Sequence, residues 1–124
     1  MKSPLILLLT RALAAAAALA LAQSALAHAY PKHRTPSAGA TVSAAQTQVS
    51  IEFDDALEPA FSSLQVADSA GKSVTSAKSS VDASDKKHMT VALEPLKPGA
   101  YTVTWVAVAA DGHRTQGHYT FTVK

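Results

Sequence analysis

The sequence predicts an all-β fold, an antiparallel Greek-key sandwich or barrel of about seven strands in a single domain. Three observations lead to this prediction. Downstream of residue 27, apolar residues alternate with polar ones at a period of two, which is typical of half-buried strands. Turn-forming residues separate these segments at intervals of about 8–12 residues, as in sandwiches and barrels. Residues 28–124 contain no convincing amphipathic helical pattern.

The first 27 residues have the features of a signal peptide. Lys2 and Arg11 flank an apolar start, and residues 12–22 form an uninterrupted Ala/Leu run. Ala25-Leu26-Ala27 then offers the small-x-small pattern that signal peptidase recognises. The run is shorter than the ~20 residues of a membrane-spanning helix. We therefore predict a cleaved leader, a periplasmic protein and no membrane span in the mature chain.

The cleavage position decides which residue begins the mature chain. We predict a cut after Ala27, which leaves residues 28–124 as the mature domain and His28 as its first residue. A cut after Ala29 is the second option, and it would expose Tyr30 instead.

Composition excludes several classes of function. Two of the eleven basic residues lie in the leader, so nine bases face nine acids in residues 28–124, and the balance favours neither nucleic acid nor anionic membranes. The absence of cysteine rules out disulfides and thiolate ligands. The domain is small for an enzyme with a deep cleft, and we predict that it is not an enzyme.

Four segments give the strongest strand signal: residues 48–53, 88–93, 101–105 and 119–123. In each, β-branched, aromatic or aliphatic residues occupy alternate positions. The residues predicted to face the core are Val49, Ile51, Phe53, Met89, Val91, Leu93, Tyr101, Val103, Trp105, Tyr119, Phe121 and Val123.

Weaker signals complete the pattern. Residues 63–67 and 72–76 read as two strands joined by a tight turn at 68–71. After Trp105, apolar residues fall on both faces, which predicts either a strand buried on both sides or a bulge. Residues 73–85, rich in Ser, Ala, Lys and Asp, read as a solvated loop.

The histidines are the only group of residues in the sequence that suggests a functional site. A terminal His28 would offer its free amine and its ring nitrogen to one metal ion. Asp111 and His113 lie in or beside the loop between the last two strands, and their spacing lets both side chains converge. Three nitrogens and one oxygen suit square-planar Cu(II). The alternative interpretation is an ordinary Asp-Gly hairpin turn followed by an unremarkable histidine.

Motifs along the whole mature chain resemble the CopC family of periplasmic copper-resistance proteins. They are the segments at 28–33 (HAYPKH), 35–40 (TPSAGA), 51–55 (IEFDD) and 98–105 (PGAYTVTW), followed by Asp111-Gly112-His113. The resemblance implies a cupredoxin-like domain that binds one Cu(II) per chain. It implies the His28 amine and imidazole, Asp111 and His113 as ligands, and a CopD-type inner-membrane protein as a partner.

Two departures from the family pattern bear on the site. Asp55 stands where the family often has a glutamate that hydrogen-bonds near the copper, and Asp54 stands where it has a serine. The mature chain also contains a single methionine, Met89, at a predicted core position. Because Cu(I) selects soft thioether ligands, we expect no Cu(I) site.

Three histidines remain. We predict that His88 and His118 face solvent and that His33 is an accessory ligand at most. The sequence thus favours a monomeric periplasmic protein that sequesters Cu(II) or carries it to a membrane partner. The alternatives are an enzyme resembling the copper monooxygenases that use a terminal histidine, and a metal-free exported Ig-like interaction module.

Overall fold

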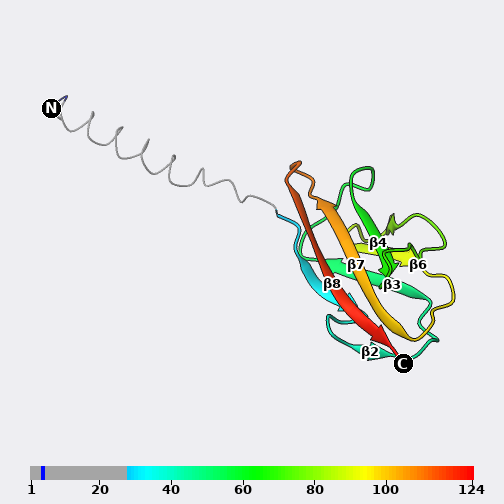
Figure 1. Cartoon of the computed structure of the whole chain (residues 1–124). Coiled ribbons are helices and arrows are strands. Elements are labelled where there is room, and N and C mark those ends of the chain that lie inside the picture. Colours follow the sequence, from blue (N-terminus) through cyan, green and yellow to red (C-terminus); the bar gives the residue numbers. More distant parts are fainter. Residues whose placement is uncertain (1–3, 5–27) are drawn as a thin grey trace.

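The computed structural model describes Pro4 and residues 28–124, and the latter form a sandwich of two four-stranded sheets (Figure 1). Apart from Pro4, the predicted signal peptide lies outside the described residues. The strands are β1 (Pro31–Thr35), β2 (Thr41–Val42), β3 (Gln48–Phe53), β4 (Ser63–Asp68), β5 (Ser80–Val81), β6 (His88–Ala92), β7 (Gly99–Val108) and β8 (Arg114–Val123).

The chain passes repeatedly from one sheet to the other, which confirms the Greek-key type of arrangement. One sheet has the order β1-β3-β6-β5 and the other the order β2-β8-β7-β4. All pairings between these strands are antiparallel except that of β2 with β8, which is parallel. The structure thus has eight strands where the sequence predicted about seven, and one short parallel pair in a fold predicted to be antiparallel.

The core lies between the two sheets and is filled by the residues that period two places inward. Ile51, Phe53 and Met89 from one sheet and Val103 from the other have no exposed surface. The rings of Phe53 and Trp105 meet edge to face with centroids 5.5 Å apart, a favourable aromatic geometry. Both sheets and this core lie within residues 28–124.

Trp105 takes its place because the residue opposite it on β8 is Gly117. A Cβ atom at Gly117 would stand 2.8 Å from a ring carbon of Trp105. The absence of a side chain at this position therefore lets the indole lie flat over the neighbouring strand.

The predicted strand at residues 72–76 is wrong. The turn at 68–71 forms, with the amide of Gly71 donating to the carbonyl of Asp68 at 3.0 Å. Beyond it, Ser73 makes an isolated bridge to Ala67 of β4, and Thr75 makes one to Leu93, the residue directly after β6 of the other sheet. The segment crosses between the sheets within two residues, so it pairs with neither for long enough to form a strand. The segment at 73–85, which was predicted to be a loop, also contains the short strand β5.

The end of β7 has buried residues on both faces and no bulge, since Ala107 is fully buried and Val108, on the opposite face, is 9% exposed. Its ladder with β8 runs without a break to the pair of Val108 and Arg114. The loop after β3 covers its other edge, where Ser62 Oγ accepts a hydrogen bond from the amide of Val108 at 3.1 Å. The amide of Glu58 donates to the carbonyl of Val108 at 2.8 Å. The first of the two predicted alternatives is therefore correct.

Candidate metal centre

The turn between β7 and β8 carries two of the candidate ligands. The amide of Ala109 donates to the carbonyl of His113 at 3.0 Å, and the amide of Gly112 donates to the carbonyl of Ala109 at 2.9 Å. Gly112 has φ of 86°, a region that favours glycine. The sequence Asp111-Gly112-His113 therefore forms a tight turn at the tip of the longest hairpin, as its loop position predicted.

Asp111 and His113 contact each other directly. Asp111 Oδ1 accepts a hydrogen bond from the backbone amide of His113 at 3.0 Å, and Asp111 Oδ2 lies 2.8 Å from His113 Nδ1. Both side chains are partly exposed, at 32% and 44% respectively. The predicted convergence of the two side chains is thus observed, although the turn produces it rather than an extended backbone.

His28 lies against this hairpin. The centroid of its ring is 4.9 Å from that of His113, with the planes tilted by 58°. In Figure 1 the coloured chain begins at the same end of the sandwich as the β7–β8 turn. The structure therefore places His28 beside the hairpin that carries Asp111 and His113, from a position more than 80 residues away in the sequence.

A buried hydrogen bond holds the residue after His28 in place. Ala29 is fully buried, and its carbonyl accepts a hydrogen bond from the hydroxyl of Thr115 on β8. The same hydroxyl lies 3.4 Å from the carbonyl of Ala107 on β7. Thr115 is the one buried polar residue among the described residues and is only 8% exposed. Because it ties the N-terminal segment to the hairpin, it positions His28 near His113.

Asp54 provides a second attachment for the N-terminal segment. Its Oδ1 accepts a hydrogen bond from the amide of Tyr30 at 2.8 Å, and its own amide donates to the carbonyl of Tyr30 at 3.0 Å. Asp55, predicted to support the metal site, is half-buried, and its Oδ1 accepts a hydrogen bond from the amide of Ala56 at 2.8 Å. Of these two aspartates, Asp54 contacts the N-terminal segment, and the supporting role of Asp55 at the metal stays a prediction.

Sequence reasoning missed Thr115 and assigned no role to the Asp54 carboxylate. A signal for Thr115 exists in hindsight, because period two places its hydroxyl among the inward residues of β8, where a polar group needs a buried partner. For Asp54 there is no such signal, since its partner lies 24 residues upstream.

As they lie, the candidate ligands are not close enough together to form a three-ligand site. Within residues 28–124, no three His, Asp or Glu side chains stand close enough together to form a metal cluster as they lie. In the full-length chain the nitrogen of His28 is also part of a peptide bond with Ala27. A complete donor set therefore requires cleavage before His28 and a rotation of the side chains.

The predicted exposure of His88 and His118 and the predicted core position of Met89 agree with the structure, whereas the accessory role of His33 stays a prediction. His118 is exposed on β8, and His88 is half-exposed on the outer face of the other sheet. Met89 is fully buried. His33 lies on β1 and pairs with Glu52 of β3.

A hollow on the described surface lies away from the candidate ligands. It is an open depression of about 540 Å³ lined by parts of residues 59–65 and 75–79.

No helix within the described part of the chain is both long and apolar enough to cross a membrane.

Fold and site together define a small Greek-key β sandwich with a histidine and carboxylate pair at the tip of one hairpin and a third histidine beside it. A model of the CopC domain family matches residues 32–124. The chain therefore belongs to the CopC family. The matched range contains Asp111 and His113 and begins four residues after His28.

Relatives cover nearly the whole chain. Protein YobA of Escherichia coli strain K12 is 37% identical over 114 residues, which cover 91% of this chain and 92% of YobA. Copper resistance protein C of Escherichia coli is 35% identical over 108 residues, which cover 82% of this chain and 85% of that protein. These similarities place the chain in a family of copper-resistance proteins.

Solved structures confirm the fold. The crystal structure of CopC from Methylosinus trichosporium OB3b superimposes with a TM-score of 0.72 at 33% identity, covering 78% of this chain and 94% of that one. PcoC from Escherichia coli, described as a methionine-rich copper resistance protein, gives a TM-score of 0.71 at 35% identity. It covers 79% of this chain and all of its own length.

Proposed function

We propose that this protein is a periplasmic Cu(II)-binding protein that sequesters copper or carries it to a membrane partner. The observation that carries the proposal is the position of the His28 ring, 4.9 Å from the ring of His113, which itself contacts Asp111. Membership of a copper-resistance family supports copper as the ion. The domain acts by binding, and we propose no catalysed reaction.

The proposed donor set is three nitrogens and one oxygen on one Cu(II). His28 supplies its amine and its imidazole, and the hairpin supplies Asp111 and His113. Imidazole nitrogen and carboxylate oxygen lie about 2.0–2.2 Å from a first-row divalent ion, so two such ligands at right angles are about 2.8–3.0 Å apart. As they lie, Asp111 Oδ2 and His113 Nδ1 are 2.8 Å apart and share a hydrogen bond, so the two side chains would rotate to place their donor atoms on the ion.

The chemistry of the donors favours Cu(II) over Cu(I). Nitrogen and carboxylate ligands in a tetragonal arrangement suit Cu(II), whereas Cu(I) prefers thioether or thiolate sulfur. The chain has no cysteine, and the methionine within residues 28–124 is Met89, which has no exposed surface. Static binding of one oxidised ion per chain follows from this set.

Export and transfer complete the proposal. The leader at residues 1–27 would deliver the domain to the periplasm, and its removal after Ala27 would create the amine ligand. Because the hairpin site is partly exposed, a partner could reach the bound ion. We propose a CopD-type inner-membrane protein as that partner and a monomer as the transferring species.

The test compares the chain that begins at His28 with the same chain carrying one extra glycine before His28. We expect one equivalent of Cu(II) with nitrogen hyperfine couplings in EPR for the first chain. We expect an affinity lower by orders of magnitude for the second, because its amine is blocked. His118→Ala, which changes an exposed histidine on β8, is the control and should bind as the parent does. Equal affinity of the two chains would overturn the proposed ligand set.

A further inference from the structure

A second group of potential metal ligands lies on the outer face of the other sheet. In the register of that sheet, His33 of β1 stands opposite Glu52 of β3, and Glu52 stands opposite His88 of β6. Directly opposite residues share a face and have Cβ atoms about 4.5–5.5 Å apart. The next residues on β3 and β6, Phe53 and Met89, are fully buried, so the row of His33, Glu52 and His88 faces outward.

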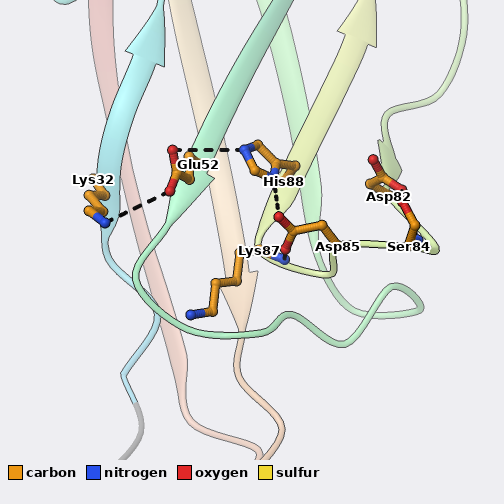
Figure 2. A network of polar contacts seen from close by, with 7 residues as sticks. All are labelled: Lys32, Glu52, Asp82, Ser84, Asp85, Lys87 and His88. Carbon is orange, nitrogen blue, oxygen red and sulfur yellow. Dashed lines mark hydrogen bonds and ion pairs between the residues drawn. The ribbon is translucent and has the colours of Figure 1, made fainter.

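His88 is oriented as a metal-binding histidine would be. Its Nδ1 lies 2.9 Å from Asp85 Oδ2, and its Nε2 faces Glu52 Oε2 at 3.8 Å (Figure 2). A carboxylate at one ring nitrogen fixes the tautomer and leaves the lone pair on the other, the arrangement that supports histidine ligands in metalloproteins. In the neutral ring, the lone pair of Nε2 is therefore directed at a carboxylate oxygen.

The separation between Nε2 and Glu52 Oε2 is suited to an ion. At 3.8 Å it is too long for a hydrogen bond. Two ligands that each lie about 2.0–2.2 Å from an ion are about 3.3–4.3 Å apart at angles between tetrahedral and linear. When the ring is neutral, an ion between the two atoms would be bound by both and would separate the two lone pairs.

We propose that the row of His33, Glu52 and His88 binds a second divalent transition-metal ion, of the Zn²⁺ or Cu²⁺ kind. His88 Nε2 and the Glu52 carboxylate are the inner pair of ligands. The three side chains do not form a metal cluster as they lie, so His33 would turn toward this pair from β1 as the third ligand, and water would complete the coordination. Asp85 orients His88. The site lies on the sheet opposite the β7–β8 hairpin and does not depend on the proposed Cu(II) centre.

The charges around the row set its affinity. Asp82 donates its backbone amide to the carbonyl of His88 at 2.9 Å. The Asp82 carboxylate, whose pKa is lowered chiefly by hydrogen bonds from Ser84, adds a negative charge near the row. Against this, Lys32 Nζ lies 3.9 Å from Glu52 Oε1 and opposes a second cation. Its side chain is 59% exposed and is free to turn into solvent when the ion binds.

The test separates this site from the hairpin by blocking the latter. The chain from His28 carries an extra N-terminal glycine and His113→Ala, and it is titrated with Zn²⁺ in competition with a chromophoric chelator. We expect one equivalent to bind, with NMR of the histidine side chains showing coordination through Nε2 of His88. Repeating the titration with Cu²⁺ by EPR shows whether the two ions share the site.

Variants in the same background identify the ligands. Glu52→Gln, His88→Ala and His33→Ala should each weaken Zn²⁺ binding at least tenfold, whereas Lys32→Met should tighten it several-fold. His118→Ala is the matched control and should have no effect, and circular dichroism checks that each variant folds. No Zn²⁺ binding, or binding that persists in His88→Ala and Glu52→Gln, overturns the proposal. Neither outcome bears on the hairpin, because that site is already disabled.

Discussion

The hydroxyl of Thr115 donates a buried hydrogen bond to the carbonyl of Ala29, across 86 residues of sequence. Ala29 follows the first residue of the proposed mature chain, and Thr115 is two residues beyond His113. The bond therefore connects the two parts of the candidate metal centre. Because Ala29 is fully buried, the connection is shielded from water and fixes where His28 can lie.

Replacing Thr115 with Val should weaken Cu(II) binding while the domain still folds. The substitution keeps the shape but leaves the Ala29 carbonyl without its donor, which costs about 1–3 kcal/mol of stability and frees the N-terminal segment. We expect at least a severalfold loss of Cu(II) affinity by competition titration and a changed EPR spectrum. Thr115→Ser should restore both, and Thr120→Val, at an exposed position of the same strand, should change neither. Parent-like affinity in Thr115→Val would contradict the positioning role.

Asp54 and Asp55 should differ in their effect on copper. Asp54→Ala removes the acceptor for the amide of Tyr30 and should lower Cu(II) affinity by loosening the segment that holds His28. Asp55→Ala removes a bond to a neighbouring amide and should have the smaller effect. Isothermal titration of both variants measures this order. The reverse order would return the supporting role to Asp55, as the family pattern implied.

Gly117→Ala should destabilise the domain without removing a ligand. The added Cβ would lie 2.8 Å from the ring of Trp105, and overpacking of this kind costs about 1–3 kcal/mol. Urea denaturation followed by Trp105 fluorescence measures the loss. A free energy of unfolding equal to that of the parent would mean that the indole shifts at no cost.

Ionisation of the Tyr119 phenol should lower the stability of the folded domain at alkaline pH. Burial raises the pKa of its phenol to about 12, against a smaller opposing effect of Arg34, whose guanidinium lies 5.6 Å from the centre of the ring. The unfolded phenol titrates near 10, so its contribution to stability is complete below pH 10 and is lost as the pH rises from about 10 to about 12. Absorbance at 295 nm should show one of the three tyrosines titrating near 12.

Tyr119→Phe supplies the control for that titration. The Tyr119 hydroxyl has no hydrogen-bond partner among the described residues, so its removal should leave the stability at neutral pH unchanged or slightly higher. The highest titration step and the loss of stability between pH 10 and pH 12 should both disappear. Their persistence would assign them to another group.

Copper binding by the mature chain should weaken below about pH 6. Imidazole and amine bind a metal only when deprotonated, and a free imidazole has a pKa near 6.5. The apparent Cu(II) dissociation constant should therefore rise steeply as the pH falls from 7 to 5. A flat response over that range would show that histidine nitrogens do not ligate the ion.

The sequence alone located the strands at 48–53, 88–92 and 101–105 and the second half of β8, and it showed which side of each faces the core, but it did not predict the first half of β8, which begins at Arg114. The correct predictions were possible because the alternation of side chains along a strand is a local property with a fixed period. The Asp-Gly turn likewise placed Asp111 and His113 at the end of a hairpin. Local chemistry also nominated His28, since its value as a ligand depends only on where the leader is cut.

Only the tertiary structure decided which residues of different strands lie opposite one another. The strands β1, β2 and β5 are short and sit at the outer positions of their sheets, so their identity depends on a partner rather than on their own pattern. The same holds for the bond from Thr115 to Ala29, for Asp54 with Tyr30 and for the row through Glu52. Each joins residues far apart in sequence, and the register between strands, which no local period encodes, brings them into contact.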